Sequence, residues 1–158
     1  MKALFIVLAL LPAIAVGEDT RQLAPLPEAA QESLRQEMLG NLTALNEVLS
    51  LMAAGKVVEA GALAEAELGV SAMGKHRSKP FAARPGPHMP PAMHGIGMDG
   101  HKVASEFARV AATGDRDKAL ALLPNLTGAC VGCHSSWRIR RNTTTCATSW
   151  RNWKRPAS

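Results

Sequence analysis

Aromatic side chains are scarce in this sequence: tyrosine is absent, and phenylalanine and tryptophan together supply only 4% of the 158 residues. β-Strands are enriched in aromatic and β-branched residues, whereas the alanine, leucine and methionine that are common here favour helices. The shortage therefore argues against a β-sheet fold. Because 47% of the residues are hydrophobic, a chain of this length can build one core, and we expect a single all-α domain.

Long hydrophobic runs are also lacking, and the longest one, residues 3–15, lies at the N-terminus. It falls short of the roughly 18 residues that a membrane-spanning helix needs. Lys2 precedes the run, and the small residues Ala15 and Gly17 end it before the chain turns polar. This arrangement is typical of a secretory signal. We therefore expect residues 1–17 to be removed on export to the periplasm, and the mature chain to have no transmembrane segment.

Acidic residues are absent after Asp117, so the charged side chains of the C-terminal part are all positive. They are Lys118, Arg138, Arg140, Arg141, Arg151, Lys154 and Arg155. A basic end suits an acidic partner protein or an anionic lipid surface, and nucleic acid is not expected as a partner of an exported chain. Residues 142–158 show no helical period and include Cys146, so we expect a poorly ordered basic tail there.

Helical patterns occur four times along the chain. In the first, apolar residues recur every three or four positions from Leu34 to Met52, as on the buried face of a long helix. Proline and glycine are dense between residues 70 and 100, which indicates a crossover loop, and Pro124 is expected to kink the last helix. Four helices with a long crossover between the second and third predict a four-helix bundle over residues 18–141. The expected helices cover residues 27–55, 57–68, 101–112 and 116–141.

The sequence Cys-Val-Gly-Cys-His at residues 130–134 is the attachment signature of c-type haem. On a helix, positions i, i+3 and i+4 share one face. The thiols of Cys130 and Cys133 can therefore reach the two vinyl groups of one porphyrin, while His134 offers a ring nitrogen to its iron. Gly132 has no side chain that would obstruct the ring. We expect one covalently attached haem c with His134 as an axial ligand.

Three other interpretations of the two cysteines are weaker. A thioredoxin-like redox pair normally belongs to a βαβ unit, and no strand pattern precedes this one. A structural zinc site needs about four nitrogen or sulfur ligands, and a second cysteine pair is missing. A structural disulfide would leave His134 without a role, and a total of three cysteines does not fit a framework made of disulfides alone.

The motif and its surroundings resemble class II cytochromes c, the cytochrome c prime group. Members of this group carry the haem motif near the end of a four-helix bundle, followed by an aromatic residue and an arginine, as Trp137 and Arg138 follow it here. The first helix is similar too, because Arg35 leads to Met38 and Leu39 where the group has an arginine before its distal residue.

Further elements are similar to a set of proteobacterial cytochromes in the same superfamily, so that the resemblance covers residues 27–141. They are Met38 and residues 64–69, 89–93 and 101–108. The resemblance implies an electron-transfer protein that meets redox partners and is not an enzyme. Because bundles of this family are often dimers, it also implies a homodimer.

The second axial position on the iron decides between two functions. A methionine there gives a six-coordinate iron suited to electron transfer, whereas an apolar residue leaves the iron open to gases such as CO and NO. Met38 lies on the inward stripe of the first helix and is the preferred ligand. The cytochrome c prime pattern instead places Leu39 there, and Met98 and His101 are further alternatives. The residues expected around the haem are Arg35, Leu39, Leu42, Trp137 and Arg138.

Histidine and methionine side chains in the crossover give a third interpretation. They are His88, Met89, Met93, His94, Met98 and His101. Imidazole and thioether groups suit copper, particularly Cu(I), in an exported protein. No fixed ligand geometry can be read from the sequence, so a loop packed near the haem edge is the preferred interpretation. Electron transfer is the expected function, with gas binding and copper binding as the alternatives.

Overall fold

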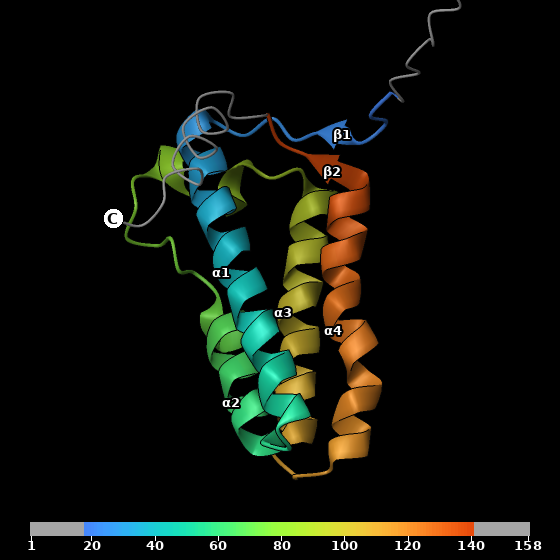
Figure 1. The fold of residues 1–158 in the computed structure, drawn as a ribbon. Coiled ribbons are helices and arrows are strands. Elements are labelled where there is room, and N and C mark those ends of the chain that lie inside the picture. The colour runs from blue at the N-terminus through green and yellow to red at the C-terminus, as the bar shows by residue number, and fades with distance from the viewer. Residues whose placement is uncertain (1–17, 141–158) are drawn as a thin grey trace, which may run out of the picture.

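A computed structural model of the chain describes residues 18–140. Within this range the chain forms four long helices that pack against one another and very little strand (Figure 1), which confirms the expected all-α bundle. Among these helices, none combines the length with the hydrophobicity that crossing a bilayer demands. The expected signal at residues 1–17 and the expected tail at 142–158, with its Cys146, lie outside the described residues.

Local signals explain where the helices begin and end. The helices are α1 (Glu28–Ala53), α2 (Val57–Leu68), α3 (Pro91–Ala111) and α4 (Arg116–Ser136). Glycines in the left-handed region separate α1 from α2 and α3 from α4, with φ 77° at Gly55 and φ 75° at Gly114. Asp115 caps α4, because its side chain accepts a hydrogen bond from the Lys118 backbone N–H.

The helices form a row of close contacts that does not close into a ring. α1 packs on α2, α2 on α3 and α3 on α4, whereas α1 and α4 are not a closely packed pair. Figure 1 shows α1 leaning away from α3 and α4 toward the end of the bundle where two short strands lie. The bundle therefore has one open side, between α1 and α4.

Buried apolar side chains gather in two clusters. The larger cluster joins all four helices and consists of Val48, Met52, Val57, Ala60, Ala64, Ala104, Phe107, Ala111, Ala119 and Leu126. The smaller cluster joins the segment before α1 to the first turns of α1 and the start of α3, and consists of Ala24, Leu26, Ala30, Leu34 and Met93. Because the two clusters use different halves of α1, the two ends of the bundle are stabilised separately.

The third helix begins ten residues earlier than the sequence pattern predicts, at Pro91 instead of His101. The glycines of this stretch favour a loop, because glycine is unfavourable inside a helix. Packing outweighs that cost. Met93 is buried in the smaller cluster, and Gly100 allows an approach to α4 in which an added Cβ would lie 3.2 Å from that of Ala129. Pro91 suits the first turn, where no N–H partner is needed.

The crossover between α2 and α3 is correspondingly shorter than predicted and covers residues 69–90. It contains three 3-10 turns, η1 (Val70–Ala72), η2 (Phe81–Ala83) and η3 (Gly86–His88). Polar contacts hold it against α1: His76 Nε2 lies 2.9 Å from Glu37 Oε2, and Lys79 Nζ donates to Ser33 Oγ at 3.0 Å. The expected crossover is therefore present and packs on the first helix.

Two short strands are a feature that the sequence pattern does not predict. β1 (Gln22–Leu23) pairs in parallel with β2 (Trp137–Arg138). α4 ends at Ser136 and not at residue 141, because the chain after it becomes extended to make this pairing. Residues 19–26, which we call the N-terminal strap, thus lie across the end of the bundle at which α4 ends (Figure 1).

Candidate functional site

The three motif residues lie in the last two turns of α4. The chain is helical through all three positions, so their spacing places Cys130, Cys133 and His134 on one side of the helix. Cys130 and His134 are exposed, and Cys133 is half-buried. Both cysteines are free thiols. The geometry that the motif requires, two thiols and an imidazole on one helical side, is therefore present.

This side of α4 continues its core face. Leu126 and Ala119 are buried in the larger cluster, and Cys130 follows Leu126 by one helical turn and Ala119 by three. A position of this kind is normally covered by a neighbouring helix, yet Cys130 is exposed, and so is His134 one turn later. The core face of α4 is uncovered at the motif because α1 does not pack closely against it.

The apolar stripe of α1 is uncovered in the same way. Leu34 and Met52 are buried as predicted, but Leu42 is 63% exposed and Leu49 is 43% exposed. These two leucines follow Met38 by one and three helical turns, so they share a face with it. We call the two incompletely covered surfaces the open faces. They comprise Met38, Leu42 and Leu49 on α1 and Cys130, Cys133 and His134 on α4.

Met38 and Cys133 pack against the same apolar cluster although they belong to the first and last helices. Both pack against the smaller cluster, as do Met89, Trp137 and Ile139. Burial raises the pKa of the Cys133 thiol, and the neighbouring Cys130 adds to this shift. A thiol of the motif and the thioether predicted as an iron ligand therefore border the same apolar cluster.

Leu39 points in a different direction from Met38. It is 68% exposed and lines a shallow depression between α1 and α2 together with Leu63 and Glu67. One residue corresponds to about 100° of rotation around a helix, so Met38 and Leu39 cannot face the same site. Of the four residues considered at the second axial position, Met38, Leu39, Met98 and His101, only Met38 packs on the cluster that Cys133 also contacts.

Two other residues expected around the haem have structural partners at this end of the bundle. Arg35 pairs with Glu32 at 3.4 Å and donates through Nη2 to the Arg140 carbonyl oxygen, which ties α1 to the chain after β2. The Trp137 side chain is half-buried against the smaller cluster, and the Trp137 backbone N–H donates to the Cys133 carbonyl oxygen. Both residues therefore stabilise the surroundings of the motif.

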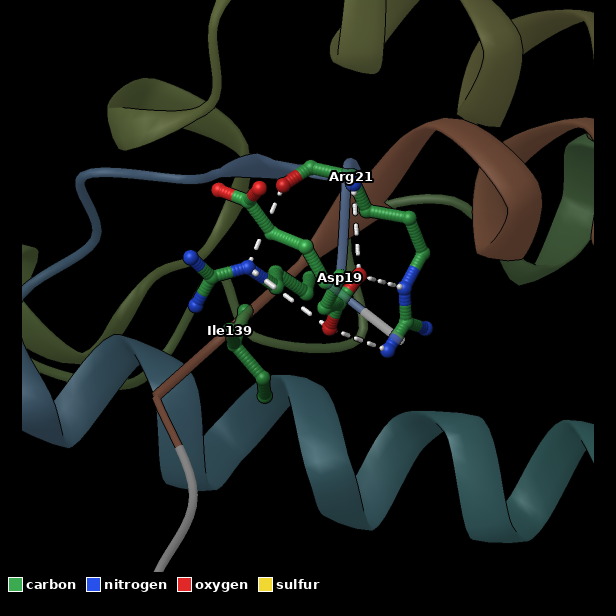
Figure 2. Close-up of a pocket in the computed structure, with 5 residues that line it drawn as sticks. Asp19, Arg21 and Ile139 are labelled. Atoms are coloured by element: carbon green, nitrogen blue, oxygen red, sulfur yellow. Dashed lines mark hydrogen bonds and ion pairs between the residues drawn. The ribbon is translucent and has the colours of Figure 1, made fainter. Parts of the chain in front are cut away.

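The chain directly after the motif is held by the N-terminal strap (Figure 2). Arg21 Nη1 donates to the His134 carbonyl oxygen at 3.3 Å, and Arg138 Nε donates to the Arg21 carbonyl oxygen at 3.1 Å. An open pocket at this place is lined by Glu18, Asp19, Arg21, Arg138 and Ile139. Asp19 and Arg21 could not be identified from the sequence, because no periodicity or motif links them to a residue more than a hundred positions away.

The histidines and methionines expected in the crossover lie partly in α3, which contains Met93, His94, Met98 and His101. The ring of His88 lies edge-on to that of Phe81 with centroids 4.9 Å apart, and His101 Nδ1 donates to the Leu68 carbonyl oxygen at 2.7 Å. Met93 is buried in the smaller cluster. Within residues 18–140, no group of three or more histidine, cysteine, aspartate or glutamate side chains is placed to hold a metal ion.

The residues of the open faces fit a covalently bound porphyrin. Free thiols and an imidazole stand on one side of α4, and apolar side chains that a flat ring could cover are exposed on α1. An iron held by porphyrin nitrogens needs only one or two protein ligands, which His134 and Met38 can supply. A zinc site of the usual composition lacks enough ligands among the described residues.

Comparisons of the chain with protein-family models, with characterised proteins and with solved structures find no match. The functional assignment therefore depends on the haem motif and on the geometry around it.

Proposed function

We propose that the chain is a periplasmic cytochrome that binds one haem c and carries single electrons between partner proteins. Cys130 and Cys133 would attach the haem, and His134 and Met38 would be the protein ligands of its iron. The observation that carries this proposal is the pair of open faces. Apolar positions that a bundle normally buries are exposed on α1, and the core face of α4 is exposed at the motif.

When bound, a c-type haem supplies reversible one-electron chemistry at its iron. The residues of this chain determine where the ring lies and how readily the iron gives up its electron. Cys130 and Cys133 would hold the ring on α4 through thioether bonds, and the same helix holds the imidazole of His134. A methionine thioether in the position of Met38 raises the reduction potential, and the apolar smaller cluster excludes water from this side.

The charge distribution suits a carrier that docks on an acidic partner protein. Basic residues lie on the strand after α4 and in the sequence beyond it, and no acidic residue follows Asp117. Opposite charge accelerates the encounter of two proteins, and salt weakens it. We expect electron transfer to an acidic partner to slow as ionic strength rises. The homodimer that the family resemblance implies stays a prediction.

The reduced absorption spectrum, recorded with and without CO, tests the function. The protein is to be produced together with haem-attachment machinery. A six-coordinate carrier gives sharp low-spin bands that CO does not change. A high-spin spectrum that shifts on addition of CO contradicts the electron-carrier proposal and favours gas binding. A colourless protein that binds Cu(I) stoichiometrically favours the copper alternative instead.

A further inference from the structure

The N-terminal strap is anchored by its short strand and by the residues that follow this strand. Ala24 and Leu26 are buried in the smaller cluster, and the Ala24 N–H donates to the Arg138 carbonyl oxygen at 2.8 Å. The pairing of β1 with β2 begins at Trp137, three residues after the motif histidine. The strap is therefore fixed to the segment that leaves the haem motif.

Arg21 connects this strap to the motif itself. Its guanidinium is held in a fork by Asp19, with Nε–Oδ1 and Nη2–Oδ2 distances of 2.9 Å each, and the remaining nitrogen, Nη1, donates to the His134 carbonyl oxygen. Arg138 donates to the Arg21 carbonyl oxygen and lies 3.7 Å from Asp19 (Figure 2). A planar guanidinium held at two points has little freedom, so its third nitrogen is aimed at one acceptor.

The acceptor, the His134 carbonyl oxygen, lies in the last turn of α4. The last four carbonyl groups of a helix have no partner within the helix, and terminal turns fray. His134 is two residues from the end of α4 at Ser136. The Trp137 backbone N–H donates a hydrogen bond to the Cys133 carbonyl oxygen, and Arg21 donates one to the His134 carbonyl oxygen. A positive guanidinium at the C-terminal end of a helix is also favoured by the helix dipole.

We propose that the N-terminal strap, acting through Arg21, is a positioning element for His134, the axial ligand. This inference rests on the proposed function. By satisfying the His134 carbonyl oxygen, Arg21 holds the last turn of α4 helical and so fixes the direction of the imidazole. Without the strap, the turn that carries the ligand frays, and the imidazole samples several orientations toward the iron.

The variant Arg21→Gln tests this role against a matched control, Arg109→Gln. Arg109 makes a comparable exposed ion pair with Glu106, but on α3 and away from the motif. Backbone hydrogen exchange in residues 133–136 and the reduction potential of the haem-loaded protein are the two measurements. Losing one hydrogen bond of ordinary strength predicts about two- to ten-fold faster exchange in Arg21→Gln. We also expect a shifted potential for this variant, and the control is expected to change neither quantity.

The conservative variant Arg21→Lys separates positioning from simple loss of charge. Lysine keeps the positive charge but lacks the planar guanidinium that binds Asp19 through two nitrogens and His134 through a third. We therefore expect Arg21→Lys to restore the exchange rate and the reduction potential only in part. If the haem-loaded Arg21→Gln protein matches Arg109→Gln in both measurements, the positioning role is wrong. A wild-type chain that takes up no haem contradicts the proposed function, which is a separate outcome.

Discussion

Met38 and Met52 lie on the same stripe of α1, but they occupy different environments. Met52 is 2% exposed within the larger cluster, whereas Met38 is half-buried at the open face. Replacing Met52 by alanine leaves a cavity in a packed core and is expected to lower the free energy of unfolding of the haem-free chain by about 2–5 kcal/mol. The same change at Met38 removes fewer buried atoms, and we expect a loss of about 1–2 kcal/mol.

For the haem spectrum we expect the opposite order, with a large change in Met38→Ala and none in Met52→Ala. Met38→Ala removes the proposed thioether ligand, so the reduced iron becomes high-spin and binds CO. Met52→Ala keeps the low-spin spectrum in spite of its lower stability. Denaturant unfolding of the haem-free chain and CO difference spectra of the loaded protein measure both effects. A Met38→Ala protein that stays low-spin and insensitive to CO refutes the ligand assignment, and a larger stability loss at Met38 than at Met52 refutes the burial argument.

Three further predictions concern the strap, the helix contacts and the thiols. The hydrogen bond from Arg21 lowers the pKa of Asp19 from 3.8 to about 2. The Asp19 carboxylate therefore stabilises the strap at pH values above 3.8, and this effect is lost as the pH falls toward 2. An NMR titration midpoint near the ordinary value would contradict this. Gly61→Ala is expected to destabilise the chain by about 1–3 kcal/mol in denaturant unfolding, because the added Cβ would lie 2.7 Å from the Ala111 methyl group on α3. An added Cβ at Gly97 would have no neighbour within 4 Å, so the control Gly97→Ala should be neutral or stabilising. In the haem-free chain, iodoacetamide should alkylate exposed Cys130 faster than Cys133, because burial raises the pKa of the Cys133 thiol. Mass spectrometry of digests measures the two rates, and equal rates would contradict the burial of Cys133.

Much of the bundle could be predicted from periodicity and from helix-terminating residues. The stripe from Leu34 to Met52 predicts α1, and Gly55 and Asp115 mark helix boundaries that the structure confirms. The predicted start of α3 was wrong, because the burial of Met93 outweighs the low helix propensity of the glycines in this segment. β1 and β2 could not be predicted either, since a two-residue ladder between distant segments leaves no period in the sequence.

The candidate site could be predicted in its covalent part but not in its surroundings. The spacing of Cys130, Cys133 and His134 fixes their common side on any helix, and the structure is helical there. The separation of Met38 from Leu39 required the packing around them, because the helical stripe and the similar proteobacterial cytochromes favour Met38, whereas the cytochrome c prime pattern favours Leu39. The link from Arg21 to the motif depends on how the chain folds back on itself, which no local signal reveals.

The most direct test of the central claim is the mass of the purified chain under denaturing conditions, after production with haem-attachment machinery. We predict a mass increase of one haem that survives denaturation and is located by digestion to the peptide holding Cys130 and Cys133. Replacing both cysteines by alanine is expected to abolish it, whereas the same change at Cys146 is not. A wild-type chain without this added mass would contradict the account.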